Sequence, residues 1–371
     1  MLHGIIIIMH LLIVTQRIDQ EDENLGAFYY WFERLSKEFD EVTIIASFVG
    51  KTDFAPHVHV HSLGKENNAG RFSRLKRFFA LFSYHYARCD AVFFHQIPEF
   101  VIAASPFLLS LKKRSVLWYA HKSVTLRLKI AERLVDFIAT SSPEGFRLAS
   151  KKVIYTGQAI NTDLFRPREE AAHFGKDHVL KLITVGRISP IKNYEQIIAA
   201  CAAGKNIWQA DWSLSIVGGP ILPRDHAYLK SLKQLIAEKN LSSHITFVGS
   251  VGYSQIPKFL QGHDIFVNVS GTGSLDKAVF EAMACGLSVL TANEAYRSII
   301  PDAYFLEHNN PEFIAERIRH LSAEERPNMA LRQIVLDHHS LETTITKLFS
   351  LLRDTTIVTN GRSVPLYIVH K

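Results

Sequence analysis

The chain has 371 residues, of which 47% are hydrophobic and 21% are charged, and its formal net charge is +6. This length and composition exclude a disordered chain and allow two domains, each with its own buried core. The three cysteines, Cys89, Cys201 and Cys285, have neither metal-ligand spacing nor the density of a disulfide framework. We therefore expect them to be reduced core residues.

The first hydrophobic run, residues 5–14, predicts a buried strand. It is too short to span a bilayer, has no basic flank and is followed by an acidic loop at residues 19–23. Because Met9 would begin this strand cleanly, residues 1–8 are interpreted as a dispensable extension or a misplaced start. Gly26 opens the next predicted helix, where the missing side chain would let the backbone approach a ligand or a neighbouring helix.

Residues 71–133 form a basic region. They contain twelve Lys or Arg and three Asp or Glu, a local net charge of +9, with aromatic residues interleaved between positions 72 and 86. A helix of this composition could lie on an anionic membrane with its cations among the headgroups. A solvated basic face over an ordinary core stripe would have the same pattern. No nucleic-acid-binding motif accompanies the charge, so we expect no nucleic-acid partner.

Histidines follow two apolar runs in the first half of the chain. His121 comes after residues 116–120 and His95 after Phe94, so each lies at the carboxyl end of a predicted strand. His121 is the stronger candidate, because a neutral imidazole there could orient an incoming hydroxyl. Three other histidines alternate with valines and share one strand face, but solvent exposure is favoured over a metal site for them: His57, His59 and His61.

In the second half, residues 181–185 predict a buried strand, followed by a loop with Arg187 and Lys192 and a helix that begins near Asn193. Ligands of open α/β sheets bind at the carboxyl ends of the strands. Both cations are therefore placed where they could neutralise one diphosphate. Surface cations beside a loop are common, so this segment alone does not establish a site.

A glycine-rich turn precedes an apolar helix that contains one glutamate, Glu281. Flanking runs at residues 264–269 and 287–291 predict a parallel sheet beneath this helix, where an unpartnered carboxylate would cost about 2–7 kcal/mol. Glu281 is therefore expected to bind ligand hydroxyls, or alternatively to lie on the wet face of the helix. Phosphate would be favoured by free N–H groups at the helix start, in Gly271, Thr272, Gly273 and Ser274. Together these features predict a nucleotide-sugar site.

These segments resemble the donor-binding domain of the family-4 retaining glycosyltransferases, which have the GT-B fold. The resemblance follows the family's order over most of the chain, at residues 11–19, 156–167, 185–192, 216–219, 245–249 and 280–286. It implies an α/β protein with two doubly wound, Rossmann-like domains facing across a cleft. It also implies a reaction that needs no metal ion or cofactor.

The resemblance implies roles for individual residues. Arg187 and Lys192 would hold the diphosphate and Glu281 the ribose, while His121 matches a family histidine near the donor sugar and the acceptor. The donor site would also include Gly26, Gly186, Gly218, Gly271, Thr272, Gly273, Ser274, Asp276 and Lys277.

The chain departs from the family at one position. The usual signature has two glutamates eight positions apart, but the position eight residues before Glu281 is Gly273. Asp276, beside Lys277, could take the place of the missing carboxylate, or it could be an acidic residue favoured by the helix dipole. The chain resembles a subgroup with Thr-Gly-Ser-x-Asp-Lys here, which favours an active enzyme.

The predicted domains are residues 1–167 on the acceptor side, residues 168–340 for the donor, and a C-terminal helix and tail at 341–371 that could pack on the first domain. The leading hypothesis is retaining sugar transfer from a nucleotide diphosphate sugar to a lipid-linked or polysaccharide acceptor. An epimerase or phosphorylase of the same fold, or an inactive nucleotide-sugar-binding protein, are the alternatives. The protein is expected in the cytoplasm, with residues 71–133 against the inner face of the membrane.

Overall fold

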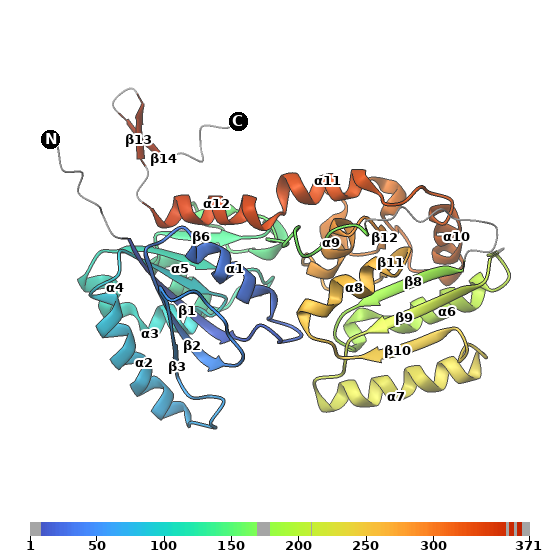
Figure 1. The fold of residues 1–371 in the computed structure, drawn as a ribbon, viewed down its shortest axis with the longest axis horizontal. Coiled ribbons are helices and arrows are strands. Elements are labelled where there is room, and N and C mark those ends of the chain that lie inside the picture. The colour runs from blue at the N-terminus through green and yellow to red at the C-terminus, as the bar shows by residue number, and fades with distance from the viewer. Residues whose placement is uncertain (1–8, 169–178, 209, 354–355, 360–361, 366–371) are drawn as a thin grey trace. The chain divides into compact units, whose positions relative to one another are not determined.

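The computed structural model describes residues 9–168, 179–208, 210–353, 356–359 and 362–365. The chain divides into two compact units, Met1–Ala159 with Leu341–Lys371, and Ile160–Ser340 (Figure 1). The predicted extension at residues 1–8 lies outside the described residues. Each unit is built on its own parallel sheet, so the prediction of two doubly wound α/β domains is confirmed.

The sheet of the first unit has the strand order β3-β2-β1-β4-β5-β6-β7, and every neighbouring pair is parallel. Because the order reverses between β1 and β4, the carboxyl ends of these two strands flank a topological switch point. The strands are β1 (His10–Ile18), β2 (Glu41–Val49), β3 (Val58–Ser62), β4 (Ala91–His95), β5 (Arg114–Trp118), β6 (Phe137–Thr140) and β7 (Val153–Tyr155).

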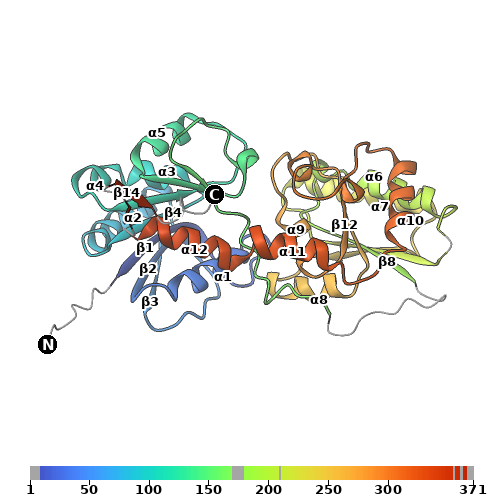
Figure 2. The same ribbon diagram turned by 90° about the horizontal axis from the view of Figure 1, so that it is seen from above.

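Helices cover both faces of this sheet (Figure 2), and a separate core of buried side chains lies on each face. Along β1, Leu11 and Ile13 pack in one core and Leu12 and Val14 in the other, which explains the uninterrupted apolar run. The first core is covered by α1 (Ala27–Ser36) and α12 (Leu341–Leu352). The second core is covered by α2 (Arg71–Tyr86), α3 (Pro98–Ala103), α4 (Ser105–Ser110) and α5 (Leu126–Leu134).

Three histidines, one buried and two half-buried, lie near one another in the first unit. His10 Nε2 is 2.9 Å from Thr43 Oγ1, and the rings of His61 and His85 are 4.8 Å apart. Burial lowers the pKa of all three, to about 4 for His85, where His61 and His10 also disfavour the charged form. Each of them therefore favours the neutral imidazole in the folded protein.

The free energy of unfolding is expected to fall as the pH drops from about 6.5 toward 4, because the unfolded chain then binds more protons than the folded one. His85→Gln is expected to reduce this loss. Urea denaturation at pH 7.5 and pH 5 measures it, with exposed His226→Gln in the second unit as the control. An equal loss in the wild type and in His85→Gln would contradict the assignment.

The second unit has the strand order β10-β9-β8-β11-β12, again with parallel neighbours, and its switch point lies between β8 and β11. The strands are β8 (Leu180–Val185), β9 (Trp212–Val217), β10 (Ile245–Gly249), β11 (Ile265–Asn268) and β12 (Ser288–Thr291). The helices are α6 (Tyr194–Gly204), α7 (Pro223–Glu238), α8 (Ile256–Gln261), α9 (Lys277–Ala284), α10 (Pro311–Leu321) and α11 (Met329–His338).

A buried ion pair joins the residue that precedes β11 to a residue near the start of α11. Asp264 Oδ1 is 2.9 Å from Arg326 Nη1, and the two side chains are only 3% and 7% exposed. Asp264 Oδ2 also accepts a hydrogen bond of 2.7 Å from the Lys181 backbone N–H on β8. This pair therefore links two strands to the segment that precedes α11.

The remaining described elements are a short antiparallel hairpin formed by β13 (Thr356–Thr359) and β14 (Arg362–Pro365) and five single-turn 3₁₀ helices. Within the described parts of the chain, no helix combines the length and the hydrophobicity needed to cross a bilayer.

Candidate active site

The two loops at the switch point of the second unit are bonded to each other. One loop joins β8 to α6 and the other joins β11 to α9. The Gly271 N–H donates to the Ile191 carbonyl at 3.3 Å, and Asn193 Nδ2 donates to the Val269 carbonyl at 3.0 Å. Asn193 has φ +52°, a left-handed conformation that asparagine tolerates, and this turn begins α6. The loops therefore form one continuous surface outside the carboxyl ends of β8 and β11.

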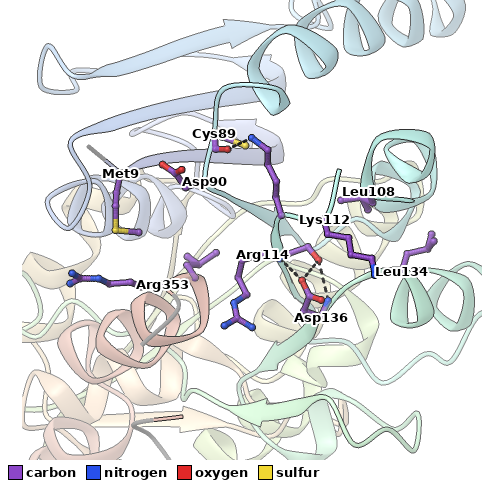
Figure 3. A pocket seen from close by; sticks show the side chains of 12 residues that line it. Met9, Cys89, Asp90, Leu108, Lys112, Arg114, Leu134, Asp136 and Arg353 are labelled. Atoms are coloured by element: carbon purple, nitrogen blue, oxygen red, sulfur yellow. Dashed lines mark hydrogen bonds between the residues drawn. The ribbon is translucent and has the colours of Figure 1, made fainter. Parts of the chain in front are cut away.

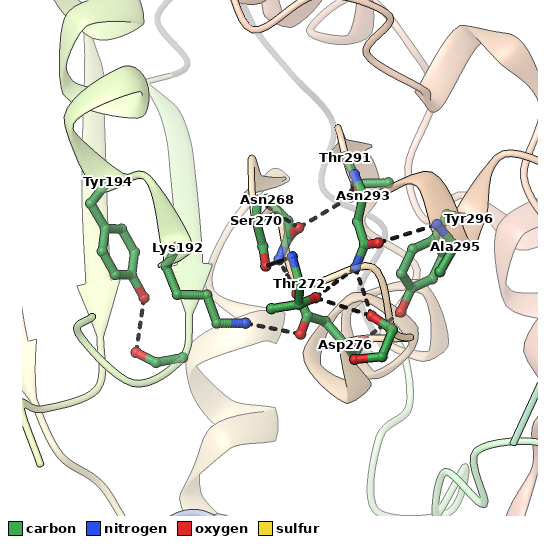
Figure 4. Close-up of polar contacts among 12 residues, drawn as sticks. Lys192, Tyr194, Asn268, Ser270, Thr272, Asp276, Thr291, Asn293, Ala295 and Tyr296 are labelled. Carbon is green, nitrogen blue, oxygen red and sulfur yellow. Dashed lines mark hydrogen bonds and ion pairs between the residues drawn. The ribbon is translucent and has the colours of Figure 1, made fainter. Parts of the chain in front are cut away.

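Lys192 and Asp276 meet across this surface (Figure 4). Lys192 Nζ is 2.9 Å from Asp276 Oδ1, and Asn268 Nδ2 donates to Asp276 Oδ2 at 3.1 Å. The side chains of the ion pair are 17% and 14% exposed, so both are mostly withdrawn from water. An anion bound between the loops would meet a cation that is already held in place.

Arg187 follows β8 and is exposed. Burial raises the pKa of Tyr194, and the positive charge of Arg187 partly opposes this shift. The pKa of Asp225 is lowered chiefly by a hydrogen bond from the Leu222 backbone N–H, and the charge of Arg187 lowers it further. Arg187 therefore projects its charge near the start of α6, on the same loop as Lys192.

Gly186 and Gly218, which were predicted to belong to the donor site, are in close contact at the carboxyl ends of β8 and β9. Gly218 has φ +133°, and a Cβ at this position would lie 2.1 Å from the Gly186 carbonyl oxygen. A Cβ on Gly186 would lie 3.6 Å from Lys192 Cε. The ends of β8 and β9 can approach this closely only because position 218 lacks a side chain.

The glycine-rich turn differs from the prediction. Helix α9 begins at Lys277, so residues 271–274 lie before the helix start. Two N–H groups that were expected to be free already donate, Gly271 to the Ile191 carbonyl and Thr272 to Ser270 Oγ at 3.4 Å. Asn293 Nδ2 donates to Thr272 Oγ1 at 3.1 Å and to the Ser274 carbonyl at 2.7 Å, and Gly273 has φ +63°. The Asn293 side chain, which lies just beyond the end of β12, therefore holds this turn in shape.

Glu281 is buried in α9, with 4% of its surface exposed. Tyr253 donates its hydroxyl to Glu281 Oε1 at 2.8 Å, so the carboxylate already has one partner within the protein. Burial raises the pKa of Glu281 and lowers the pKa of Lys277 to about 8, and each charge opposes the shift of the other. The wet-face alternative is wrong, because Glu281 points into the unit.

Glu281→Gln is expected to weaken the binding of the donor's nucleoside diphosphate by about 1.5–3 kcal/mol, since the amide keeps the shape and loses charge-assisted acceptance. Calorimetric titration measures this loss. The exposed substitution Glu238→Gln serves as the matched control. Unchanged affinity in Glu281→Gln would exclude a ribose contact.

His121 and Gly26 belong to the first unit. His121 lies in the loop after β5, where it is exposed, and its Nδ1 accepts a hydrogen bond of 3.1 Å from the Ser123 N–H. Gly26 caps α1 with φ −56°, which is an ordinary helical value, so its conformation does not demand glycine. His95 is buried at the β1/β4 switch point, with Nδ1 3.0 Å from Thr15 Oγ1.

The three alternating histidines do not converge on one point. His57 Nε2 is 3.1 Å from the Ser36 carbonyl, His59 is 3.9 Å from Glu41, and His61 packs against His85. Within residues that the structure describes, no group of three or more histidine, cysteine or acidic side chains is placed to hold a metal ion.

A cavity of about 910 Å³ lies outside the amino ends of the strands of the first sheet (Figure 3). It is lined by the amino ends of four strands, including Asp90 and Asp136, and by the end of α12. Both carboxylates already accept hydrogen bonds of 2.8 Å, from the His10 and Ser115 N–H groups. Since ligands of such sheets bind at the carboxyl ends, this cavity is separate from the candidate site.

Three polar residues at the site were missed by sequence reasoning. Tyr253 bonds Glu281, Asn268 bonds Asp276, and Asn293 holds the glycine-rich turn. Asn268 and Asn293 are buried at or near strand ends, and an amide beside an apolar run was a usable signal. Tyr253 offers no such signal, because it comes from a distant 3₁₀ turn.

The two parallel sheets, each with a switch point, define the GT-B fold of glycosyltransferases. The structure is similar to Anabaena Alr3699/HepE in complex with UDP and glucose, with a TM-score of 0.70 and 14% identity over 94% of this chain and 100% of that one. It is also similar to sucrose-phosphate synthase from Thermosynechococcus elongatus, with a TM-score of 0.69 and 17% identity over 92% and 98%. At these identities the likeness establishes the fold alone.

Sequence comparison relates this chain to particular glycosyltransferases. Residues 166–334, which lie within the second unit, match the family Glycosyl transferases group 1, and this match supports a place in that family. The chain is 24% identical over 187 residues to the GDP-mannose-dependent alpha-(1-6)-phosphatidylinositol monomannoside mannosyltransferase of Mycobacterium tuberculosis. That alignment covers 46% of this chain and 47% of the relative, so the chain spans about half the length of the curated relatives it matches.

Proposed function

We propose that this protein is a retaining glycosyltransferase that moves a sugar from a nucleotide diphosphate sugar to a hydroxyl of its acceptor. The observation that carries this proposal is the pair of cations on the β8–α6 loop, with Lys192 held at the switch point of a GT-B domain. Buried Glu281 on α9 supplies the carboxylate for the ribose. The family match of the second unit supports the same assignment.

The proposed mechanism depends on the charges that develop as the sugar is transferred. As the diphosphate leaves, negative charge grows on its oxygens and positive charge on the anomeric carbon. Arg187 and Lys192 would stabilise the diphosphate without a metal ion, and the His121 imidazole would orient the acceptor hydroxyl. Asp276 and Lys277 are proposed as members of the donor site, beside Lys192 and Glu281 respectively.

The proposed acceptor is lipid-linked or a polysaccharide. The lipid alternative is supported by the mycobacterial relative, which is named as a phosphatidylinositol monomannoside mannosyltransferase. The nucleotide-sugar donor is supported by the likeness to a structure that holds UDP and glucose.

A donor screen tests this function. At 100 times its dissociation constant, the correct nucleotide sugar should stabilise the folded protein by about 2.7 kcal/mol, which a thermal shift detects. The selected donor is then incubated with membrane lipids and with polysaccharide, and the products are separated. Transfer to an acceptor supports the proposal, whereas isomerised donor indicates an epimerase and binding without turnover indicates an inactive binding protein.

We also propose that the first unit lies on an anionic membrane surface through α2 and its neighbours. An apolar stripe on α2, Phe72, Leu75 and Phe79, is exposed, with Phe72 84% exposed, and Leu126 at the start of α5 is 73% exposed. A groove of about 430 Å³ with mainly apolar walls separates α2 from α3 and α5. Exposed cations are carried by the same two helices, namely Arg71, Lys76, Arg77, Arg127 and Lys129. Helices that combine exposed apolar side chains with cations suit the boundary between headgroups and acyl chains.

Wild-type protein is expected to sediment with anionic vesicles and not with neutral ones, because each Lys or Arg near an anionic surface contributes roughly 1 kcal/mol. The triple substitution of Arg71, Lys76 and Lys129 by Glu should abolish sedimentation. A matched triple change of the exposed Lys205, Lys230 and Lys239 to Glu in the second unit should preserve it. Failure of the wild type to sediment at low salt would remove the membrane proposal and favour a soluble acceptor.

A further inference from the structure

Asp276 uses both carboxylate oxygens within the protein. Oδ1 accepts a hydrogen bond of 2.9 Å from Lys192 Nζ, and Oδ2 accepts one of 3.1 Å from Asn268 Nδ2. The Tyr296 hydroxyl donates to the backbone carbonyl of Asp276, which restrains the main chain at this residue (Figure 4). The carboxylate is therefore turned toward Lys192 and away from bulk water.

Asn268 has only one possible orientation in this network. It is 4% exposed, and its Oδ1 accepts from the Ser270 N–H at 3.3 Å and from Thr291 Oγ1 at 3.1 Å. A backbone N–H can only donate, so the oxygen of the amide must face Ser270 and the NH₂ group must face Asp276. The rigid end of β11 thus determines where the Asp276 carboxylate points.

We propose that Asp276 is a positioning residue that holds Lys192 in place for the leaving diphosphate, and that Asn268 orients Asp276 for this task. The inference rests on the proposed function, because it assigns a role in the same site. A free lysine side chain loses rotamer entropy when it is ordered, and the ion pair imposes that order before the donor binds. Stabilisation of developing charge depends on such prior organisation.

The proposal predicts opposite effects on binding and turnover. The negative charge of Asp276 repels a bound diphosphate, so its removal leaves nucleoside diphosphate affinity unchanged or higher. Its removal also frees Lys192 to adopt other rotamers, so kcat falls. A carboxylate that touched the donor directly would instead affect kcat and donor affinity together.

Two substitutions and a control test this role. Asp276→Asn removes the charge, and Asn268→Asp replaces the orienting NH₂ group by a carboxylate that repels Asp276. In each, kcat is expected to fall at least about tenfold, while the Kd of UDP or GDP, whichever the wild type binds, and the Kd of the matching nucleotide sugar without acceptor both rise less than about threefold. Asp302→Asn, at an exposed position of the same unit, should match the wild type.

The possible outcomes are distinct. If the wild type binds neither UDP nor GDP and transfers no sugar, the proposed function itself fails. If the wild type is active and both variants keep its kcat, or if kcat and affinity fall by the same factor, Asp276 does not position Lys192. If thermal denaturation shows that Asp276→Asn is unfolded, Asn268→Asp alone decides between these results.

Discussion

Lys192→Ala is expected to lower kcat by about 10²–10³-fold, the scale seen when one donor to a developing oxyanion is removed. Lys192 Nζ is the cation that Asp276 holds at the switch point between β8 and β11, so its removal takes away a charge that is already ordered. Steady-state kinetics with the preferred donor measure the loss. Full activity in Lys192→Ala would exclude this residue from the site.

Arg187→Ala is expected to lower kcat at least about tenfold through the same leaving group. The double variant should lose less than the sum of the two single losses in ΔΔG‡, because the proposed function has both cations act on one diphosphate. The exposed Lys205→Ala, on the same unit, serves as the control and should leave kcat unchanged. Strict additivity would mean that the two cations act on separate steps.

Arg326→Ala is expected to cost about 3–5 kcal/mol of the stability of the second unit. The substitution leaves Asp264 as a buried charge beside β11, where the lost partner was 2.9 Å away. Urea denaturation measures the loss. The exposed pair Arg319–Glu316, with N···O at 2.8 Å, is the matched control, because Arg319→Ala should cost less than about 1 kcal/mol.

A second substitution separates charge from packing at this site. Asp264→Asn removes the buried charge but keeps an oxygen for the hydrogen bond from the Lys181 N–H, which measures 2.7 Å in the wild type. The double variant Asp264→Asn with Arg326→Met should therefore be more stable than Arg326→Ala alone. A cost below about 1 kcal/mol for Arg326→Ala would show that water reaches Asp264.

The fold could be predicted because strands that are buried on both faces leave a local signature. Residues 11–14 are apolar at every position since neighbouring side chains enter cores on opposite faces of the sheet. The positions of Arg187 and Lys192 follow from the same reasoning, because a loop after a buried parallel strand must emerge at the ligand-binding edge.

The partners of the site residues could not be predicted in this way. Tyr253 reaches Glu281 from a segment 28 residues earlier, and Asn293 reaches the glycine-rich turn from beyond β12. The turn was expected to present free N–H groups, yet Gly271 donates to a loop that follows a different strand. Such contacts depend on which strands lie side by side, and local periodicity carries no information on that order.

The sequence by itself therefore determined two doubly wound domains, the strand ends that bear the cations, and the helix that carries Glu281. Only the tertiary structure decided that Asp276 pairs with Lys192 across 84 positions of the chain and that Asn268 orients it. The physical reason is that local backbone conformation, and the apolar periodicity that predicts which face is buried, are encoded by neighbours along the chain. The pairing of buried polar groups depends instead on the arrangement of β8, β11 and β12 in space, because each donor must find an acceptor wherever the strand order places one.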